Sequence, residues 1–234
     1  MRILSLSFGL ALLLGACLAA ATTVAAAEDA AVAVDTHVPL GQQLYEAAEK
    51  GSPFEVSQIL LTNPEVDLTW TNTEFLDWTP LHTAVANGHI DVVRVLLSHP
   101  NIDVNTRKAV EGTSVLSWAV YQRHYDIVEL LLHDARVDVN QANDNDFTPM
   151  VWAVHWGNSE NFELLIGSGR ELEMGGPDRP AADALAWAAK RRKPVAAQWI
   201  QDYKIDPQAA RVKARQARGI TGKAITPTTL FVWP

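Results

Sequence analysis

The sequence of 234 residues contains a single cysteine and none of the common catalytic or metal-binding motifs. One cysteine, Cys17, excludes an internal disulfide and a cage of thiolate metal ligands. The His-x-x-x-His and His-Glu-x-x-His spacings of zinc sites are missing, as are the Gly-x-Ser-x-Gly elbow and the glycine-rich phosphate loops. We therefore expect no catalytic residues, no metal and no cofactor, and an enzyme with a grafted site is only a remote alternative.

Positive charge is scarce over most of the chain and concentrated at its end. Residues 1–189 hold 9 lysines and arginines against 25 aspartates and glutamates, whereas residues 190–234 hold 10 against 2. We predict that the basic segment folds onto the acidic remainder, with an anionic membrane surface or an acidic partner as the alternative. Nucleic acid is not an expected partner, because no other part of the chain offers a basic face.

The first residues are typical of a secretory signal. Residues 1–27 combine a positive Arg2, an apolar stretch and three alanines at 25–27 that offer a cleavage site before Glu28. An uncleaved membrane anchor is the alternative, since the apolar run is about 20 residues long. We expect residues 28–39 to form a flexible linker. The pattern predicts a protein exported to the periplasm or cell envelope, or secreted.

Cys17 has a second possible role. Residues 14–17 read Leu-Gly-Ala-Cys and resemble the bacterial lipobox, in which the cysteine is lipidated. Lipidation of Cys17 would tie the protein to a membrane, whereas cleavage after residue 27 would leave a mature chain without cysteine. Both alternatives stay open. Apart from such an anchor, we expect membrane contact only if the basic tail binds anionic lipid.

Three motifs recur in one phase along the chain. A four-residue motif ends in an alanine at intervals of 34 to 37 residues, at Ala47, Ala84, Ala119, Ala153 and Ala188. Residues 89–97 match residues 124–132, and Asp-Val-Asn occurs at both 103–105 and 138–140. Such a period indicates helix pairs that bury their apolar faces only against neighbouring copies.

Residues 79–84 read Thr-Pro-Leu-His-Thr-Ala and match the Thr-Pro-Leu-His-x-Ala signature of ankyrin repeats. Over residues 40–203 the chain resembles the ankyrin-repeat family. The resemblance implies an all-α solenoid of about five helix pairs with finger loops and degenerate outer repeats. The approximate repeats are 40–72, 73–108, 109–142, 143–176 and 177–203. Threonine caps followed by proline at 79–80 and 148–149 suit helix starts independently of the resemblance.

Two departures and the tail need separate interpretation. Arg123 and Arg192 stand where the family prefers glycine between the helices, and either would be strained at a positive φ. Residues 204–234 are predicted to be a basic tail that packs on the last repeat, with a helix over 208–216. Its apolar end at 228–233 either covers the solenoid end or adds a strand to a partner.

The resemblance implies that the concave face and the fingers bind another protein. The two positions before each inter-helix glycine face the concave groove in this family, and the first finger is extended and rich in aromatic residues. The candidate partner-binding residues are Asn87, Tyr121, Gln122, His155, Trp156, Lys190 and Arg191 on the groove, with Trp70 and Phe75 in the finger. Trp118, Trp152 and Trp187 share another position and are interpreted as core. We expect an envelope scaffold, inhibitor or assembly aid, or alternatively a secreted effector that binds a host protein.

Overall fold

The computed structural model describes residues 38–73, 77–107, 110–156, 159–176 and 178–219. This part of the chain contains eleven α-helices and no β-strand. Five helices form an inner row: α2 (Leu40–Lys50), α4 (Pro80–Ala86), α6 (Val115–Gln122), α8 (Pro149–Trp156) and α10 (Ala184–Lys190). Their partners are α3 (Pro53–Thr62), α5 (Ile90–Ser98), α7 (Tyr125–His133), α9 (Ser159–Gly167) and α11 (Pro194–Ile205).

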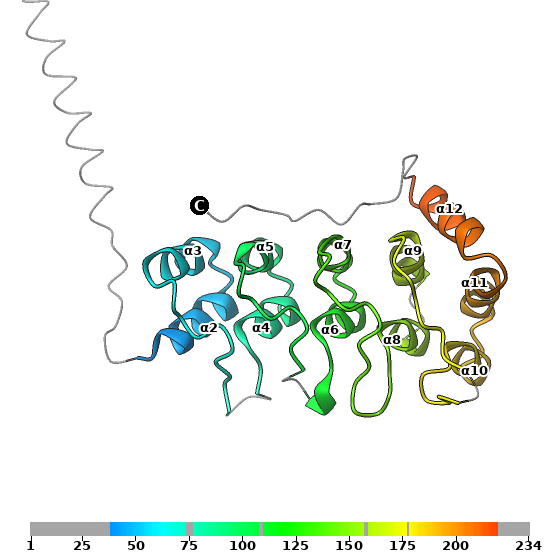
Figure 1. Ribbon diagram of the computed structural model, residues 1–234, viewed down its shortest axis with the longest axis horizontal. Coiled ribbons are helices and arrows are strands. Elements are labelled where there is room, and N and C mark those ends of the chain that lie inside the picture. The colour runs from blue at the N-terminus through cyan, green and yellow to red at the C-terminus, as the bar shows by residue number, and fades with distance from the viewer. Residues whose placement is uncertain (1–37, 74–76, 108–109, 157–158, 177, 220–234) are drawn as a thin grey trace, which may run out of the picture. The chain divides into compact units, whose positions relative to one another are not determined.

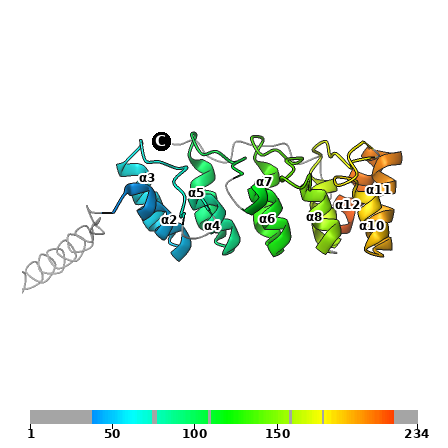
Figure 2. The ribbon, with the colours of Figure 1, turned by 90° about the horizontal axis from the view of Figure 1, so that it is seen from below.

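The helix pairs stack side by side, and the loops between them extend beyond the inner row (Figure 1). Seen from below, the helices of the inner row follow one another in chain order (Figure 2). Each inner helix packs against the next, and so does each outer helix. The surface of the inner row, with the loops beside it, is called the inner face below. The all-α solenoid of five stacked helix pairs predicted from the sequence is confirmed in the described residues.

Side-chain caps start four of the five inner helices that the structure describes, among them the two predicted at Thr79 and Thr148. Thr79, Ser114 and Asp183 accept hydrogen bonds from amides two or three residues ahead, and Thr148 accepts one from the amide of Val151 at 3.3 Å. These helices have only 7 to 11 residues, too few to persist alone in water. Packing must therefore hold them. The motif alanines at 84, 119, 153 and 188 are fully buried, which lets neighbouring helices approach closely.

The Asp-Val-Asn motif ties consecutive loops together. The side-chain nitrogen of Asn105 donates to the carbonyl of Arg136 at 2.8 Å, and its oxygen accepts from the amide of Asp138 at 2.7 Å. Asn140 repeats this arrangement with the backbone of the next loop, at 2.9 Å for both bonds. Each asparagine thus satisfies two backbone groups one repeat away, which explains why the motif recurs with the period of the stack.

Contacts with the next repeat require glycine at two of the turns between paired helices. Gly51 and Gly88 both have φ of 75°, the left-handed conformation that ends an α-helix. A Cβ at Gly51 would lie 2.6 Å from the ring of His89, and one at Gly88 would lie 2.9 Å from that of His124. The histidine at the equivalent turn of the next repeat therefore fills the space that a side chain would need.

Arg123 and Arg192 adopt the same left-handed conformation without being glycine. Their φ angles are 63° and 54°, so the strain foreseen from the sequence is present at both turns. The Arg123 side chain nevertheless forms a contact with the next repeat, because its Nη2 donates a hydrogen bond to the carbonyl of Trp156 at 3.4 Å. The cost of the left-handed backbone is of the order of 1 kcal/mol at each position.

The tail begins with α12 (Pro207–Ala217), which packs against α9 and α11. Its Arg215 is buried and donates from Nε to the carbonyl of Gly167, the last residue of α9, at 2.8 Å. Lys213 pairs with Asp202 at 2.6 Å, and Arg218 pairs with Glu129 at 3.2 Å. The cations of this helix are therefore engaged within the chain, as the acidic and basic halves of the sequence suggest.

Several expectations fall on residues outside the described part. These are the signal and linker over 1–37 with Cys17, the finger residue Phe75, and the apolar end over 228–233. Among the helices that the structure describes, none is both long enough and apolar enough to cross a membrane.

Candidate functional site

A continuous set of aromatic rings runs along the inner face, and we call it the aromatic row. It consists of Trp78, Trp118, Tyr121, Phe147, Trp152, His155, Trp156 and Trp187. Every member lies within 6.2 Å of another, measured between ring centroids, and most contacts are edge-to-face. This geometry is the favourable one for aromatic pairs, because a ring edge meets the electron-rich face of its neighbour.

Repeat spacing places these rings together. Trp118, Trp152 and Trp187 occupy the same position on α6, α8 and α10, so stacking the helices brings the indoles onto one side. Tyr121 lies one turn after Trp118 and contacts it at 5.4 Å between centroids. Tyr121 also contacts Trp152 at 5.7 Å and Trp156 at 5.1 Å, both on the next inner helix. Tyr121 therefore joins two repeats in one surface.

Trp156 is the most exposed ring of the row. It ends α8, and 43% of its surface is accessible to solvent. Its ring lies 5.0 Å from that of His155 and 5.1 Å from that of Tyr121, so its neighbours limit its orientation. A large exposed aromatic side chain held by other rings can contact a partner with little loss of conformational freedom.

Two cations adjoin the row at α10. The ammonium of Lys190 lies 4.6 Å from the ring centroid of Trp187, within the range of a cation–π contact. Nη2 of Arg191 lies 2.6 Å from Nε2 of His155. Burial and then the nearby charges of Arg191 and Lys190 hold the pKa of His155 below its usual 6.5. A neutral imidazole is therefore kept between the aromatic rings and the two cations.

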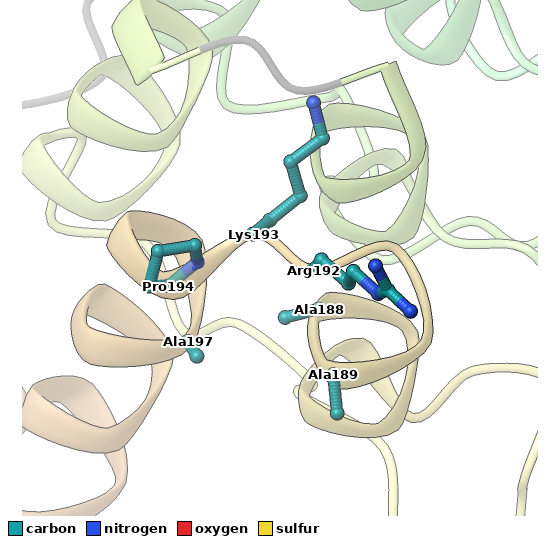
Figure 3. Close-up of a pocket in the computed structure, with 6 residues that line it drawn as sticks. All are labelled: Ala188, Ala189, Arg192, Lys193, Pro194 and Ala197. Carbon is teal, nitrogen blue, oxygen red and sulfur yellow. The ribbon is translucent and has the colours of Figure 1, made fainter.

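A small hollow lies next to these cations, where α10 turns into α11. It has a volume of about 400 Å³, and its walls come from Ala188, Ala189, Pro194 and Ala197. Figure 3 shows these small side chains facing the space beside the turn that carries Arg192 and Lys193. Cationic side chains therefore border an apolar depression at the end of the stack.

Comparison with known proteins agrees with the repeat phase. A family model for ankyrin repeats matches residues 44–143 as three copies. Residues 44–143 belong to the ankyrin-repeat family. Ankyrin repeats generally mediate interactions between proteins. The match covers the first three helix pairs, in which the signature over 79–84 is best preserved.

Two curated relatives share part of the ankyrin region. Human SMC5-SMC6 complex localization factor protein 1 is 35% identical over 77 residues, which are 33% of this chain and 7% of that protein. The protein of the same name from Bos taurus is 43% identical over 56 residues, 24% of this chain and 5% of that protein. The chain thus spans less than a tenth of the length of the curated relatives it matches, and the likeness concerns the repeats.

The structure brings together four of the candidate residues of the ankyrin groove, Tyr121, His155, Trp156 and Arg191. Asn87 and Gln122 lie on the same face, and each donates a long hydrogen bond to a carbonyl of the preceding repeat, at 3.5 and 3.4 Å. Lys190 lies beside these residues and contacts the ring of Trp187 through its ammonium group. The repeat phase was sufficient to place these residues on one side of the stack.

Two interpretations of aromatic residues change in the structure. Trp118, Trp152 and Trp187 pack against the core but are only partly buried, so the core interpretation is correct in part. Trp70, a candidate binding residue of the finger, packs against α2, since its ring lies 5.4 Å from that of Tyr45. Its aromatic surface is therefore already partly used within the chain.

Sequence reasoning did not select Phe147, although it connects three rings of the row. Its ring lies 5.1 Å from that of Trp187 and 6.2 Å from those of both Trp152 and His155. One signal could have identified it. Phe147 directly precedes the capping Thr148, as Trp78 directly precedes the capping Thr79. The two aromatic residues therefore occupy equivalent positions, each immediately before the N-cap of an inner helix.

The described residues contain no group of three or more histidine, cysteine, aspartate or glutamate side chains that could hold a metal ion. The acidic residues of the loops instead pair with arginines of neighbouring loops. Arg107 contacts Asp144 at 2.5 Å, and Arg179 binds both Asp146 and, at 2.7 Å, Glu173. The pairs of Arg107 with Asp144 and of Arg179 with Asp146 connect successive repeats.

Proposed function

We propose that this chain is a binding module that holds another protein against the aromatic row of its inner face. The exposed ring of Trp156, fixed between Tyr121 and His155, carries the proposal. Tryptophan, tyrosine and arginine dominate the binding energy of protein interfaces when they are clustered and well packed. Here all three types meet within one surface, and a stack of short helices presents them without ordering a flexible segment.

We also propose that the protein acts outside the cytoplasm. The signal-like pattern over residues 1–27 supports this, together with the lack of cysteine after residue 17. An envelope scaffold, inhibitor or assembly aid fits such a location, and a secreted effector is the alternative. The binding surface has no feature of a reaction centre among the residues described, so we propose no enzymatic role.

Affinity capture with a matched pair of variants tests the binding face. The full chain would be used as bait in its native host, beside Trp156→Ala and the control Phe54→Ala. Phe54 is 59% exposed on α3, so the control also removes an exposed ring, but away from the inner face. A genuine partner should be retained by the wild type and the control. The Trp156→Ala bait should lose it by tenfold or more, the effect of about 1.4 kcal/mol.

The partner would then be purified and its dissociation constant measured for each variant. The double variant Tyr121→Ala with Trp156→Ala should bind more weakly than either single variant. Circular dichroism and urea unfolding would establish that all variants keep the fold. Equal retention of the same partners by the folded double variant would show that the proposed face is wrong.

Cell fractionation and the intact mass of the mature chain test the location. A chain that begins at Glu28 in the envelope fraction would support export with a cleaved signal. A lipid-modified chain that begins at Cys17 would assign it to the membrane, and Cys17→Ala should then release it. Recovery from the culture medium alone would favour the secreted effector, and a full-length cytoplasmic chain would contradict export.

A further inference from the structure

We infer that the segment recognised by the inner face is acidic, with carboxylates that bind the cations at residues 190–193 beside an apolar side chain that contacts Trp156. This inference rests on the proposed binding role of the inner face and specifies the chemistry of the partner.

Six of the twelve other cations that the structure describes form ion pairs with carboxylates. Arg136 contacts Asp134 at 2.6 Å, Arg218 contacts Glu129 at 3.2 Å, and Lys213 contacts Asp202 at 2.6 Å. In contrast, none of the four consecutive cations at 190–193 forms an ion pair with a carboxylate in the part of the chain that the structure describes. In a chain of net charge −8, four adjacent unpaired cations form a distinct surface.

These cations lie on both sides of one turn. Lys190 and Arg191 adjoin the aromatic row through Trp187 and His155. Arg192 and Lys193 border the apolar hollow between α10 and α11 (Figure 3). The turn therefore offers positive charge next to two separate apolar surfaces. A segment in which carboxylates alternate with apolar side chains matches this order.

A further cation lies at the backbone of Trp156. The guanidinium of Arg123 donates to the carbonyl of Trp156 at 3.4 Å, and Arg191 contacts His155, the residue before Trp156. Within the described residues, Arg123 too forms no ion pair. Two arginines therefore contact the residues 155 and 156, which carry the exposed end of the aromatic row. Arginine binds carboxylates through two parallel hydrogen bonds, which gives such a site directional preference.

A protein segment fits this surface better than a membrane or nucleic acid. Residues up to 189 are strongly acidic, and the finger loops beside the inner face carry many of their carboxylates. A flat anionic bilayer or a duplex would bring phosphates against these carboxylates as well as against the cations. A single peptide segment can touch the cations alone, and screening beyond about 8 Å reduces repulsion from the rest of the surface.

Selection from a displayed library of random peptides tests the inference. The library, of about 12 residues per peptide, would be selected on the immobilised full chain and on three variants. The charge variant is Lys190→Gln with Arg191→Gln. The control is Arg94→Gln with Lys204→Gln, which removes two cations outside the proposed surface. Trp156→Ala reports on the aromatic row.

Peptides selected by the wild type and by the control should be enriched in aspartate and glutamate next to a leucine or an aromatic residue. The charge variant should lose the acidic enrichment. A selected peptide should bind the wild type about tenfold more tightly than its Asn/Gln twin by fluorescence anisotropy, and the difference should shrink to about twofold in the charge variant. It should also be smaller at about 150 mM salt than at about 50 mM.

The outcomes separate the two proposals. Peptides that need Trp156 but carry no acidic enrichment would overturn this inference and leave the binding face in place. Selection that is indifferent to Trp156 would overturn both. Stronger binding of phosphatidylglycerol vesicles or of a short duplex DNA, dependent on Lys190 and Arg191, would also overturn the inference, because the cations would then serve phosphates.

Discussion

Arg191 and His155, 36 residues apart in the chain, are joined by a contact of 2.6 Å between Nη2 and Nε2. An arginine nitrogen can only donate, so Nε2 of His155 must accept and the imidazole must be neutral. Two protons would otherwise face each other. The lowered pKa of His155, caused by burial and by the charges of Arg191 and Lys190, is consistent with this arrangement.

The first prediction concerns the titration of His155. Its ring protons should titrate with a midpoint below 6.5 in an NMR experiment, and Arg191→Gln should raise that midpoint while burial keeps it below the ordinary value. Lys190→Gln should raise it less, because the Lys190 charge is the smaller contribution. An unchanged or lower midpoint in Arg191→Gln would contradict the assigned hydrogen bond.

Opposite effects are expected at two equivalent turns. Arg123→Gly should stabilise the protein by about 0.5–1 kcal/mol, because glycine adopts the φ of 63° without strain. Gly88→Ala should destabilise it by more than about 1 kcal/mol, since the new Cβ would lie 2.9 Å from the ring of His124. Urea unfolding measures both. Arg123→Ala is the control, and a gain in stability there would show that strain is not the cause.

Removal of the buried guanidinium on α12 should weaken the fold. Arg215→Met keeps much of the packing but leaves the carbonyl of Gly167 without its donor, so we expect a loss of about 1–3 kcal/mol in unfolding free energy. Lys213→Met removes an exposed pair with Asp202 and should cost less than about 1 kcal/mol. Equal losses would show that α12 is held by surface charge alone.

Stability should fall on mild acidification because of His82. Burial lowers its pKa from 6.5 to about 4, and the Thr113 backbone opposes this only in part. Below pH 6.5 the unfolded chain therefore binds a proton that the folded chain does not. The contribution of His82 is constant above pH 6.5. As the pH falls from 6.5 toward 4, the unfolding free energy should drop by at most about 1.4 kcal/mol per pH unit.

The variant His82→Gln isolates this effect. It should be less stable than the wild type at pH 7, because a buried imidazole that contacts Thr79 is lost. Its stability should nevertheless depend less on pH between 6.5 and 5. Urea unfolding at several pH values measures the two slopes, and parallel slopes would assign the pH dependence to other groups.

The repeat phase explains how much of the structure could be predicted. The period of the motif alanines and the signature over 79–84 led to the helix pairs, and the tail helix expected over 208–216 is observed as Pro207–Ala217. Tyr121, His155 and Trp156 could be placed on one face because equivalent positions of stacked repeats must align. Phe147 escaped this reasoning because it lies in a loop, where the helical period does not apply.

The sequence by itself determined the helix starts, the stacking order and the side of the stack that carries the candidate residues. These properties follow from local caps and from a period that every copy repeats. The tertiary structure decided which charged side chains form ion pairs or hydrogen bonds within the chain and which are left without an ion pair. Arg215 is buried against α9, whereas Lys190 and Arg192 are exposed. The sequence alone does not distinguish the buried cation from the exposed ones. Ion pairs and ring contacts join residues one or more repeats apart, so they depend on distances that only the folded chain sets.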